Sequence, residues 1–379
     1  MAWEFHGKGG IHPEMLFEAV PDIDLSRIAF GFQYFPETGF ADFFACDSES
    51  VVELDSPISL LSYLGNSAFV AFPFQPGAKG YLIPPFLDIQ DCVSRRFVVE
   101  GFYRDDEDSD DSGEGFVSVG TDSVYKSLVS ATIESIDNGI FEKVVLSRSV
   151  RLPFSGKELA GFLKRICERY SGSNFVVFNI PGKGLWVSAS PEILVASGHS
   201  ILGANHSQVL AHALAGTKLG NDTLWSEKEI IEQALVAGFI RDKFAEIVGQ
   251  GRVKEFGPIT FDAGDLSHIS TVFHLEGGNA ELAVRLAASL HPTPAVCGFP
   301  FDSAYGWIVD NEELDRSFFT GFSGSFHPER IKFVVNLRTA CFRDEQLIFY
   351  AGAGITSGSD PEAELSETAA KINVLRQLI

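Results

Sequence analysis

Four charged side chains in the second half of the chain have spacings that suit acid–base or metal chemistry. Glu229 and Glu232 are three residues apart in a segment with helical periodicity, so both carboxylates face the same way, as ligands of Mg²⁺ or of its waters would. Glu367 and Lys371 are four residues apart, the favourable spacing for an ion pair along a helix. Ordinary exposed helices show both spacings too, so the residues alone leave a purely structural role open for each pair.

Two further residues could act as a base and an acid. Lys143 opens the segment KVVLSRSV, in which side chains alternate between two faces and Val145 shares the face of the lysine. A lysine there could protect a strand edge, or it could serve as a general base. Glu192 follows an apolar strand that ends at Pro191, where burial would raise the pKa of its carboxyl and make it an acid. An exposed loop glutamate is the alternative.

Three other features could bind an anion. The glycine-rich turns at 211–220 and 350–360 can bring backbone N–H groups close to a carboxylate. The second turn is not the dinucleotide-binding fingerprint, because the third glycine and the parallel βαβ context are absent. Arg338 is predicted to lie on an apolar strand, where its guanidinium needs an anionic ligand or a buried acid as partner.

The elements that must position these residues follow from the hydrophobic periodicity. Helices are expected at 122–138, at about 155–170, at about 225–248 and from Pro361 onward, and strands at 67–74, 143–150, 174–180, 184–190 and 331–342. Strands come in runs rather than in strict alternation with helices. The sequence therefore predicts an α+β fold with largely antiparallel sheets.

The composition is that of a globular protein with a large core. Of the 379 residues, 45% are hydrophobic and the net charge is −22, which argues against nucleic acid or a membrane as partner. The five cysteines are widely spaced and form no C-x-x-C pair, so we expect reduced thiols. Because the N-terminus lacks signal-peptide features and no apolar run reaches about 18 residues, we expect a cytoplasmic protein.

An ordered set of motifs carries a resemblance to a known family. The motifs are KVVLSR, SASPEILV, ALAGT, EKEIIEQALV, HIST, LHPTPAVCGFP, DRSFFTGFSG, NLRTA and AGAGITSGSDPEAELSETAAK. The set closely resembles the chorismate-utilising enzymes, which include isochorismate synthase, salicylate synthase and anthranilate synthase component I, and it covers about 120–379. The resemblance implies the anthranilate synthase component I-like fold, with two stacked antiparallel β-sheets flanked by helices and the active site between the sheets.

The same resemblance implies one chorismate-binding domain over 1–379. Within it we distinguish an N-terminal lobe (1–103), an acidic loop (104–115) and the chorismate-binding catalytic region (116–379). The run RDDEDSDDSGEG in the acidic loop cannot pack because of its like charges.

Carried over motif by motif, the resemblance assigns a cofactor and a substrate site. Glu232 and Glu367 would bind Mg²⁺, which in turn holds the ring carboxylate of chorismate. Arg338 and Lys371 would pair with substrate carboxylates, and His268 would lie beside the ring. The implied substrate-binding residues are Gly216, Thr217, His268, Arg338, Gly352 and Lys371.

The residue at the Lys143 position separates the branches of the family, because the members that add water carry lysine there. The resemblance therefore implies that Lys143 deprotonates a water attacking C2, while Glu192 protonates the departing C4 hydroxyl from the opposite side of the ring. The product would be isochorismate, a precursor for menaquinone or siderophore biosynthesis, and the enzyme an isomerase. After Glu232 the Arg-Asn-Asp pattern of ammonia-using members is absent. No glutamine amidotransferase subunit is expected.

Two alternatives stay open. Salicylate synthases share the lysine and the acid, and Ser188, Ile269 and Cys297 depart from residues common in the family, which leaves the choice of product open. The alternative of another class is a non-catalytic chorismate-binding subunit.

Overall fold

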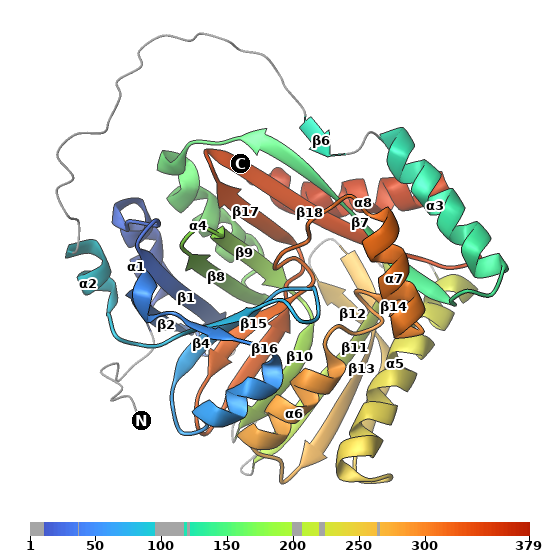
Figure 1. Ribbon diagram of the computed structural model, residues 1–379, viewed down its shortest axis with the longest axis horizontal. Helices are drawn as coiled ribbons and strands as arrows, with labels where there is room; N and C mark the ends of the chain where they lie inside the picture. Colours follow the sequence, from blue (N-terminus) through green and yellow to red (C-terminus); the bar gives the residue numbers. More distant parts are fainter. Residues whose placement is uncertain are drawn as a thin grey trace.

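Two stacked β-sheets form the centre of the molecule, and helices cover their outer faces (Figure 1). The structure is a computed structural model, and it describes residues 11–36, 38–94, 117–119, 122–198, 207–219, 224–263 and 266–379. The acidic loop 104–115 lies outside the described residues. Within them, each sheet has nine strands, and neighbouring strands pair antiparallel. The predicted α+β class with two antiparallel sheets flanked by helices is confirmed.

The first sheet carries the strand that Lys143 opens. Its path from edge to edge is β14 (Gly298–Phe299), β7 (Lys143–Pro153), β18 (Gln346–Ile355), β17 (Thr339–Arg343), β9 (Gly184–Ser190), β8 (Asn174–Ile180), β1 (Ile28–Phe35) and β2 (Phe40–Asp47), with β6 (Val117–Val119) paired to β7. The first sheet therefore combines strands from both ends of the chain.

The second sheet also combines strands from distant parts of the chain. Its path is β12 (Lys254–Ala263), β13 (Leu266–Glu276), β11 (Gln208–Leu219), β10 (Ile193–Gly198), β16 (Ile331–Val335), β15 (Phe322–Phe326), β4 (Ala68–Phe72), β5 (Gly80–Ile83) and β3 (Val52–Leu54). Because strands from the first hundred residues join both sheets, the N-terminal segment packs with the catalytic region.

The described residues form eight α-helices, of which the hydrophobic periodicity predicted four (122–138, about 155–170, about 225–248 and from Pro361 onward). They are α1 (Pro13–Ala19), α2 (Ile89–Ser94), α3 (Asp122–Asp137), α4 (Leu159–Arg169), α5 (Glu227–Val248), α6 (Ala280–Leu290), α7 (Phe301–Asn311) and α8 (Pro361–Arg376), and the short 3-10 helices are η1 (Val20–Asp22), η2 (Ser48–Ser50), η3 (Pro57–Tyr63) and η4 (Gly156–Glu158). The side chain of Asp360 accepts a hydrogen bond from the Ala363 N–H at 2.9 Å and caps α8. This is the start signal expected at this point of the sequence.

Apolar faces fix the helices on the sheets. Val236, Ile240 and Phe244 recur at helical spacing on α5 and are buried against the second sheet. Phe162 and Ile166 of α4 are buried in the same way against the first sheet. Each such side chain contributes roughly 1.5–3 kcal/mol by burial. The helices are thus held rigidly enough to present charged residues from their ends and inner faces.

Two of the points at which the chain changes sheets lie next to each other. The chain leaves the first sheet after β9 and enters β10 of the second at Glu192, and it returns between β16 and β17 at Arg338. The Ala189 N–H donates to the Arg338 carbonyl at 3.3 Å, and the Val335 N–H donates to the Glu192 carbonyl at 3.2 Å. The two crossovers therefore bring Glu192 and Arg338 together between the sheets.

Strands form over 331–342 as predicted, but the expectation that Arg338 lies on one of them is wrong. The structure has two strands there, β16 and β17, and Arg338 lies in the connection with a φ of +47°. Asn336 ties this connection to a neighbouring turn, because its side-chain amide donates to the Phe318 carbonyl at 2.9 Å. The apolar pattern runs unbroken through the crossover, since both strands are buried. For this reason the pattern does not show that the chain changes sheets.

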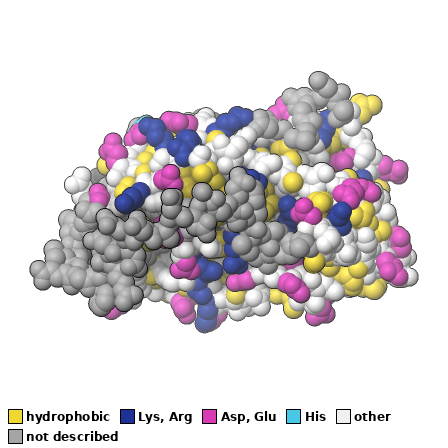
Figure 2. Space-filling view, turned by 90° about the horizontal axis from the view of Figure 1, so that it is seen from above, with side chains coloured by type: hydrophobic (Ala, Val, Ile, Leu, Met, Phe, Trp, Pro, Cys, Tyr) yellow, Lys and Arg dark blue, Asp and Glu magenta, His cyan; other side chains and the backbone are white. Residues whose placement is uncertain are grey.

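The described surface carries charges of both signs. On the face drawn in Figure 2, Lys and Arg side chains are scattered among acidic and hydrophobic ones. All five cysteines are buried, and none is joined to another by a disulfide. In the described part of the chain, no helix is both long and apolar enough to cross a membrane.

One buried carboxylate links the two sheets at an edge. Asp42 of β2 lies 2.9 Å from His327 Nε2 and 2.7 Å from an Arg330 nitrogen, and both partners belong to the hairpin of β15 and β16. Burial raises the pKa of Asp42, but the hydrogen bond and charge of His327 and the charge of Arg330 outweigh burial. The pKa therefore lies below its ordinary value of 3.8.

Asp42→Asn is expected to lower the free energy of unfolding at pH 7 by about 1–3 kcal/mol, because His327 and Arg330 lose a charged acceptor. Since the folded-state pKa is lowered, this contribution is fully present above pH 3.8 and is lost as the pH falls through the folded-state pKa. Urea unfolding at pH 7 and pH 3 measures it. Glu329→Gln, an exposed change of equal charge in the same hairpin, is the control. An equal loss at both pH values would contradict the assignment.

Candidate active site

A pocket between the two sheets gathers most of the predicted site residues. Eight of the ten line it: Glu192, Gly216, Thr217, Glu232, His268, Arg338, Gly352 and Lys371. Lys143 and Glu367 lie directly behind this lining, each in an ion pair with one of its members. The apolar part of the wall includes Phe319 and Tyr350, which also belong to the aromatic cluster that holds the sheets together.

Glu192 is buried in the crossover from β9 to β10. Its side chain is 1% exposed, and the Ser190 hydroxyl accepts from the Glu192 N–H at 3.1 Å, which fixes the turn. Burial raises the pKa of the Glu192 carboxyl to about 8, and the charge of Lys143 only partly offsets this effect. The predicted environment of Glu192 is thus present: a buried carboxyl that can carry a proton near neutral pH.

Lys143 is fully buried and does not protect an exposed strand edge. β7 has neighbours on both sides there, because β14 pairs with Lys143 and Val144 on one edge and β18 covers the other. The Lys143 Nζ lies 2.9 Å from Glu232 Oε1. Burial raises the pKa of Glu232, but the charges of Lys143 and Lys228 outweigh burial and lower it, so the carboxylate is ionised. A buried lysine is thereby held at the base of the pocket.

Gly354 makes room for this pair. A Cβ atom built on Gly354 would lie 2.3 Å from Glu232 Oε1 and 3.1 Å from Lys143 Cε, so only glycine fits. Gly354 was not among the predicted site residues, although the AGAG segment is the signal that could have pointed to it. The first glycine of that segment, Gly352, has its carbonyl turned toward α8.

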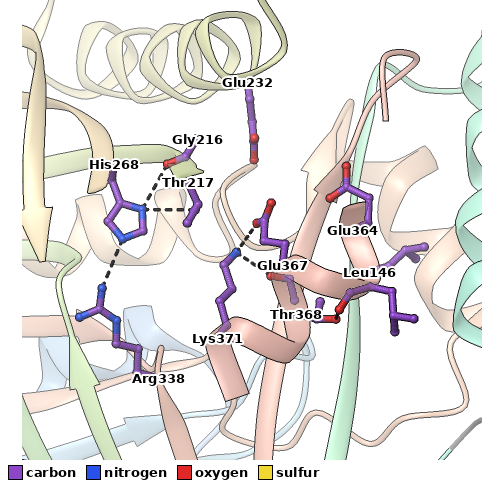
Figure 3. Close-up of polar contacts among 12 residues, drawn as sticks. Leu146, Gly216, Thr217, Glu232, His268, Arg338, Glu364, Glu367, Thr368 and Lys371 are labelled. Carbon is purple, nitrogen blue, oxygen red and sulfur yellow. Dashed lines mark hydrogen bonds and ion pairs between the residues drawn. The ribbon is translucent and has the colours of Figure 1, made fainter. Parts of the chain in front are cut away.

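α8 supplies the second pair of charges. Lys371 Nζ lies 2.7 Å from Glu367 Oε1 and donates to the Gly352 carbonyl at 2.8 Å (Figure 3). The predicted i, i+4 ion pair is therefore present, and it lies at the pocket rather than on an outer helix face. In Figure 3, Glu232 points from α5 toward Glu367 on α8, so carboxylates from two helices approach each other.

His268 connects the glycine-rich turn to Arg338. Its Nδ1 lies 3.2 Å from the Gly216 carbonyl and 3.3 Å from Thr217 Oγ1, and its Nε2 lies 3.4 Å from an Arg338 nitrogen (Figure 3). Because guanidinium only donates, Nε2 must accept and Nδ1 must carry the proton. Burial and the charges of Arg338 and Lys371 lower the pKa of His268 to about 3. The ring is therefore neutral with one defined tautomer.

Gly216 occupies a β-bulge in which the neighbouring residues leave no room for a side chain. The register between β11 and β13 shifts between Ala215 and Thr217, and Gly216 has a φ of +71°. A Cβ there would lie 2.9 Å from the Cβ of Glu229 on α5. The bulge turns the carbonyl of Gly216 toward His268.

The suggestion that Glu229 shares a metal with Glu232 is wrong. The Glu229 carboxylate accepts from the Ser226 N–H at 2.9 Å and closes a capping box at the start of α5. The i, i+3 spacing is correct, but one member of the pair satisfies the helix terminus. Ser226 three residues before Glu229 is the capping signal in the sequence.

A second buried pair near the carboxylates was missed. Glu364 on α8 is 2% exposed and lies 2.5 Å from Lys228 Nζ on α5. Burial raises the pKa of Glu364 and nearby Glu367 adds to it, while Lys228 lowers it. The net effect is a raised pKa of Glu364. The i, i+3 spacing of Glu364 and Glu367 on α8 is the sequence signal that could have found it.

The donor set fits Mg²⁺ as sequence analysis expected. Mg²⁺ in enzymes is bound by one or two carboxylates together with waters and substrate oxygens. Glu232 points toward Glu367 in Figure 3, and each of the two carboxylates is paired with a lysine. Among the described residues, no group of three or more His, Cys, Asp or Glu side chains could form an all-protein metal site. Such a metal would depend on ligand oxygens.

Comparison with known proteins identifies the family. A family model described as chorismate binding enzyme matches residues 105–379. This chain belongs to the chorismate-binding enzymes. Isochorismate synthase DhbC of Bacillus subtilis is 34% identical over 275 residues, which are 66% of each chain. The vibriobactin-specific isochorismate synthase of Vibrio cholerae is 30% identical over 266 residues (66% of this chain, 65% of the relative), and isochorismate synthase EntC of Escherichia coli K12 is 32% identical over 243 residues (62% and 61%).

The matched segments span slightly less than two thirds of the length of these relatives. Solved structures extend the likeness to the whole chain. The menaquinone-specific isochorismate synthase MenF of Escherichia coli has a TM-score of 0.74 at 17% identity and covers 96% of this chain and 90% of its own. Anthranilate synthase component I of Streptococcus pneumoniae has a TM-score of 0.61 at 17% identity, with 92% of each chain covered. At these identities the likeness establishes the fold, and the expected anthranilate synthase component I-like architecture is confirmed.

Proposed function

We propose that this chorismate-binding enzyme is an isochorismate synthase, an isomerase that converts chorismate to isochorismate with Mg²⁺. One observation carries the proposal: Glu192, a buried carboxyl with a pKa raised to about 8, lines the pocket, and the fully buried Lys143 lies behind the lining, paired with the lining residue Glu232. Exchange of one hydroxyl for another needs an acid and a base at one site. The isochorismate synthases at 30–34% identity support the same activity.

Cationic and neutral polar groups along the pocket match the substrate. Chorismate carries two carboxylates, and Arg338 and Lys371 lie at the pocket on different elements, so each can pair with one of them. His268 is neutral and would lie beside the ring without attracting a third anion. Backbone groups of Gly216, Thr217 and Gly352 complete the proposed substrate-binding site.

The proposed reaction uses Lys143 and Glu192 on opposite faces of the ring. Lys143 in its neutral form removes a proton from a water molecule that attacks C2. The ring double bonds shift, the C4–oxygen bond breaks, and the departing hydroxyl takes the proton of Glu192 and leaves as water. Lys143 ends protonated and Glu192 ionised, and exchange with solvent restores both. Because the nucleophile is water, we propose that no glutamine amidotransferase subunit is needed.

Glu232 and Glu367 would hold Mg²⁺ in this proposal. The ion would neutralise the ring carboxylate and fix its orientation. In the protein itself, Lys143 pairs with Glu232 and Lys371 pairs with Glu367, which supports this placement of the two carboxylates.

Chromatographic product analysis tests the proposal. Purified protein with chorismate and Mg²⁺ is expected to form isochorismate. Removal of the metal with a chelator is expected to lower turnover by at least ~10²-fold, because several kcal/mol of charge stabilisation are lost, and added Mg²⁺ should restore it. Salicylate and pyruvate as the final products would instead establish the salicylate synthase alternative. Chorismate binding by calorimetry without any product would establish a non-catalytic subunit.

A further inference from the structure

The outer edge of β7 next to the pocket is completed by side chains instead of a strand. Within the described residues, β14 pairs with β7 at Lys143 and Val144, and β6 pairs with it from Ser149 onward. Between these two stretches the Val145 carbonyl and the Ser147 N–H point outward. An unsatisfied backbone edge at a buried position is costly, so both groups need partners.

Arg316 and Glu312 provide these partners. Arg316 Nη2 donates to the Val145 carbonyl at 2.7 Å, and the Ser147 N–H donates to Glu312 Oε2 at 2.9 Å. Arg316 Nη1 also donates to the Val296 carbonyl at 2.9 Å. The two side chains thus connect the backbone of β7 to the segment that precedes β14.

The pair itself is rigid and buried. Arg316 Nε lies 2.6 Å from Glu312 Oε1 and Nη2 lies 2.7 Å from Oε2, and both side chains are 2% exposed. The Arg316 guanidinium carbon also lies 4.3 Å from the ring centre of Phe74. The planar guanidinium group has five N–H donors and can make all these contacts at once, whereas the ammonium group of a lysine cannot.

We propose that Arg316 and Glu312 are positioning residues for the proposed isochorismate synthase reaction. Val145 and Val296, whose carbonyls Arg316 holds, both line the pocket, and Lys143 is two residues from Val145 on the same strand. The pair fixes this wall and the strand that carries Lys143. Neither Arg316 nor Glu312 lines the pocket, so neither contacts the substrate.

A role in stability alone makes a different prediction. Breaking a buried ion pair leaves one uncompensated charge and is strongly destabilising, whereas replacing both partners by apolar residues of similar volume is often neutral or stabilising. The double variant Arg316→Met/Glu312→Leu therefore separates the two roles. If the pair only stabilises the fold, the double variant regains activity together with stability. If the pair positions β7, stability recovers in part and the rate does not.

Both single variants should be unstable. The double variant should regain only part of the lost stability, because it leaves the Val145 and Val296 carbonyls and the Ser147 N–H without the partners they have in the wild type. Its kcat should still fall at least ~10-fold, with KM within about threefold of wild type, because catalytic alignment is lost while Arg338 and Lys371 bind from other elements. Arg285→Met/Glu281→Leu removes an exposed pair of the same i, i+4 spacing and should leave kcat unchanged. Wild-type kcat in the folded double variant overturns the proposal.

Arg316→Lys provides a second test if the double variant does not fold. It keeps the charge opposite Glu312 but cannot bridge both carbonyls, so kcat should again fall ~10-fold at unchanged KM. Wild-type kcat in this variant overturns the proposal as well. Absence of turnover in the wild-type enzyme would mean that the proposed function has failed instead. Hydrogen exchange then decides about the positioning role: faster exchange at Val145–Ser147 in a variant of normal global stability supports it, and unchanged exchange overturns it.

Discussion

Lys143→Ala is expected to lower kcat by ~10²–10⁴-fold while chorismate still binds, because the change removes the proposed general base and leaves the carboxylate-binding groups in place. No other lysine can replace it within the described residues around the pocket. Lys371 is engaged with Glu367 and Lys228 with Glu364, each on α5 or α8 rather than on the first sheet. Steady-state kinetics measures the loss, and calorimetry with chorismate measures binding.

The controls must separate loss of the base from loss of the buried charge. Without Lys143, the Glu232 carboxylate lacks its nearest cation, which costs about 3–5 kcal/mol for a buried pair, so thermal unfolding has to be followed in parallel. Lys143→Arg keeps a cation opposite Glu232 but cannot deprotonate, and it should be equally inactive. Small primary amines should restore part of the turnover of Lys143→Ala. Normal turnover by either variant would contradict the base assignment.

Glu192→Gln should be the second most damaging change, with kcat reduced by ~10²–10⁴-fold and KM little altered. Glutamine has nearly the same shape, so the buried crossover stays packed, but it cannot donate a proton to the departing hydroxyl. The pH profile of the wild-type enzyme gives independent evidence. A general acid is active while protonated, and burial raises the pKa of Glu192 to about 8. The part of turnover that depends on protonated Glu192 should therefore be retained below pH 8 and decline as the pH rises through this value.

Measurement of kcat from pH 6 to pH 10 tests this direction of the pH dependence. The alkaline decline with a midpoint near pH 8 should be present in the wild-type enzyme and absent from the residual activity of Glu192→Gln. His268 is no alternative source, because burial and neighbouring cations lower its pKa to about 3. Glu192→Gln with wild-type turnover at pH 7 would exclude the acid role.

Much of the fold was predictable because local patterns and tertiary packing agree. The helices α3 and α5 begin and end close to their predicted bounds, and α8 begins at Pro361 as its start signal predicted. The antiparallel architecture followed from strands that come in runs. The family resemblance then placed charged residues at one site, and eight of ten line one pocket.

The sequence could not show what depends on contacts between distant elements. The surroundings of Lys143 suggested a strand edge, yet β14 and β18 bury it, and both come from more than a hundred residues later. Arg338 was expected inside a strand, but it lies in a crossover between sheets that is invisible to periodicity. Glu229 has the spacing of a metal-binding pair with Glu232, but its carboxylate accepts from the Ser226 N–H and caps α5. In each case, tertiary contacts decide the role of a locally ambiguous residue.

The central claim is that a water molecule adds to C2 while the original C4 hydroxyl departs. Turnover of chorismate in water enriched with oxygen-18, followed by mass spectrometry of isochorismate, tests it most directly. The proposed roles of Lys143 and Glu192 predict that one labelled oxygen enters each product molecule, at C2. Isochorismate that carries no label would show that the hydroxyl moves within the substrate, and it would contradict a mechanism in which a base activates water.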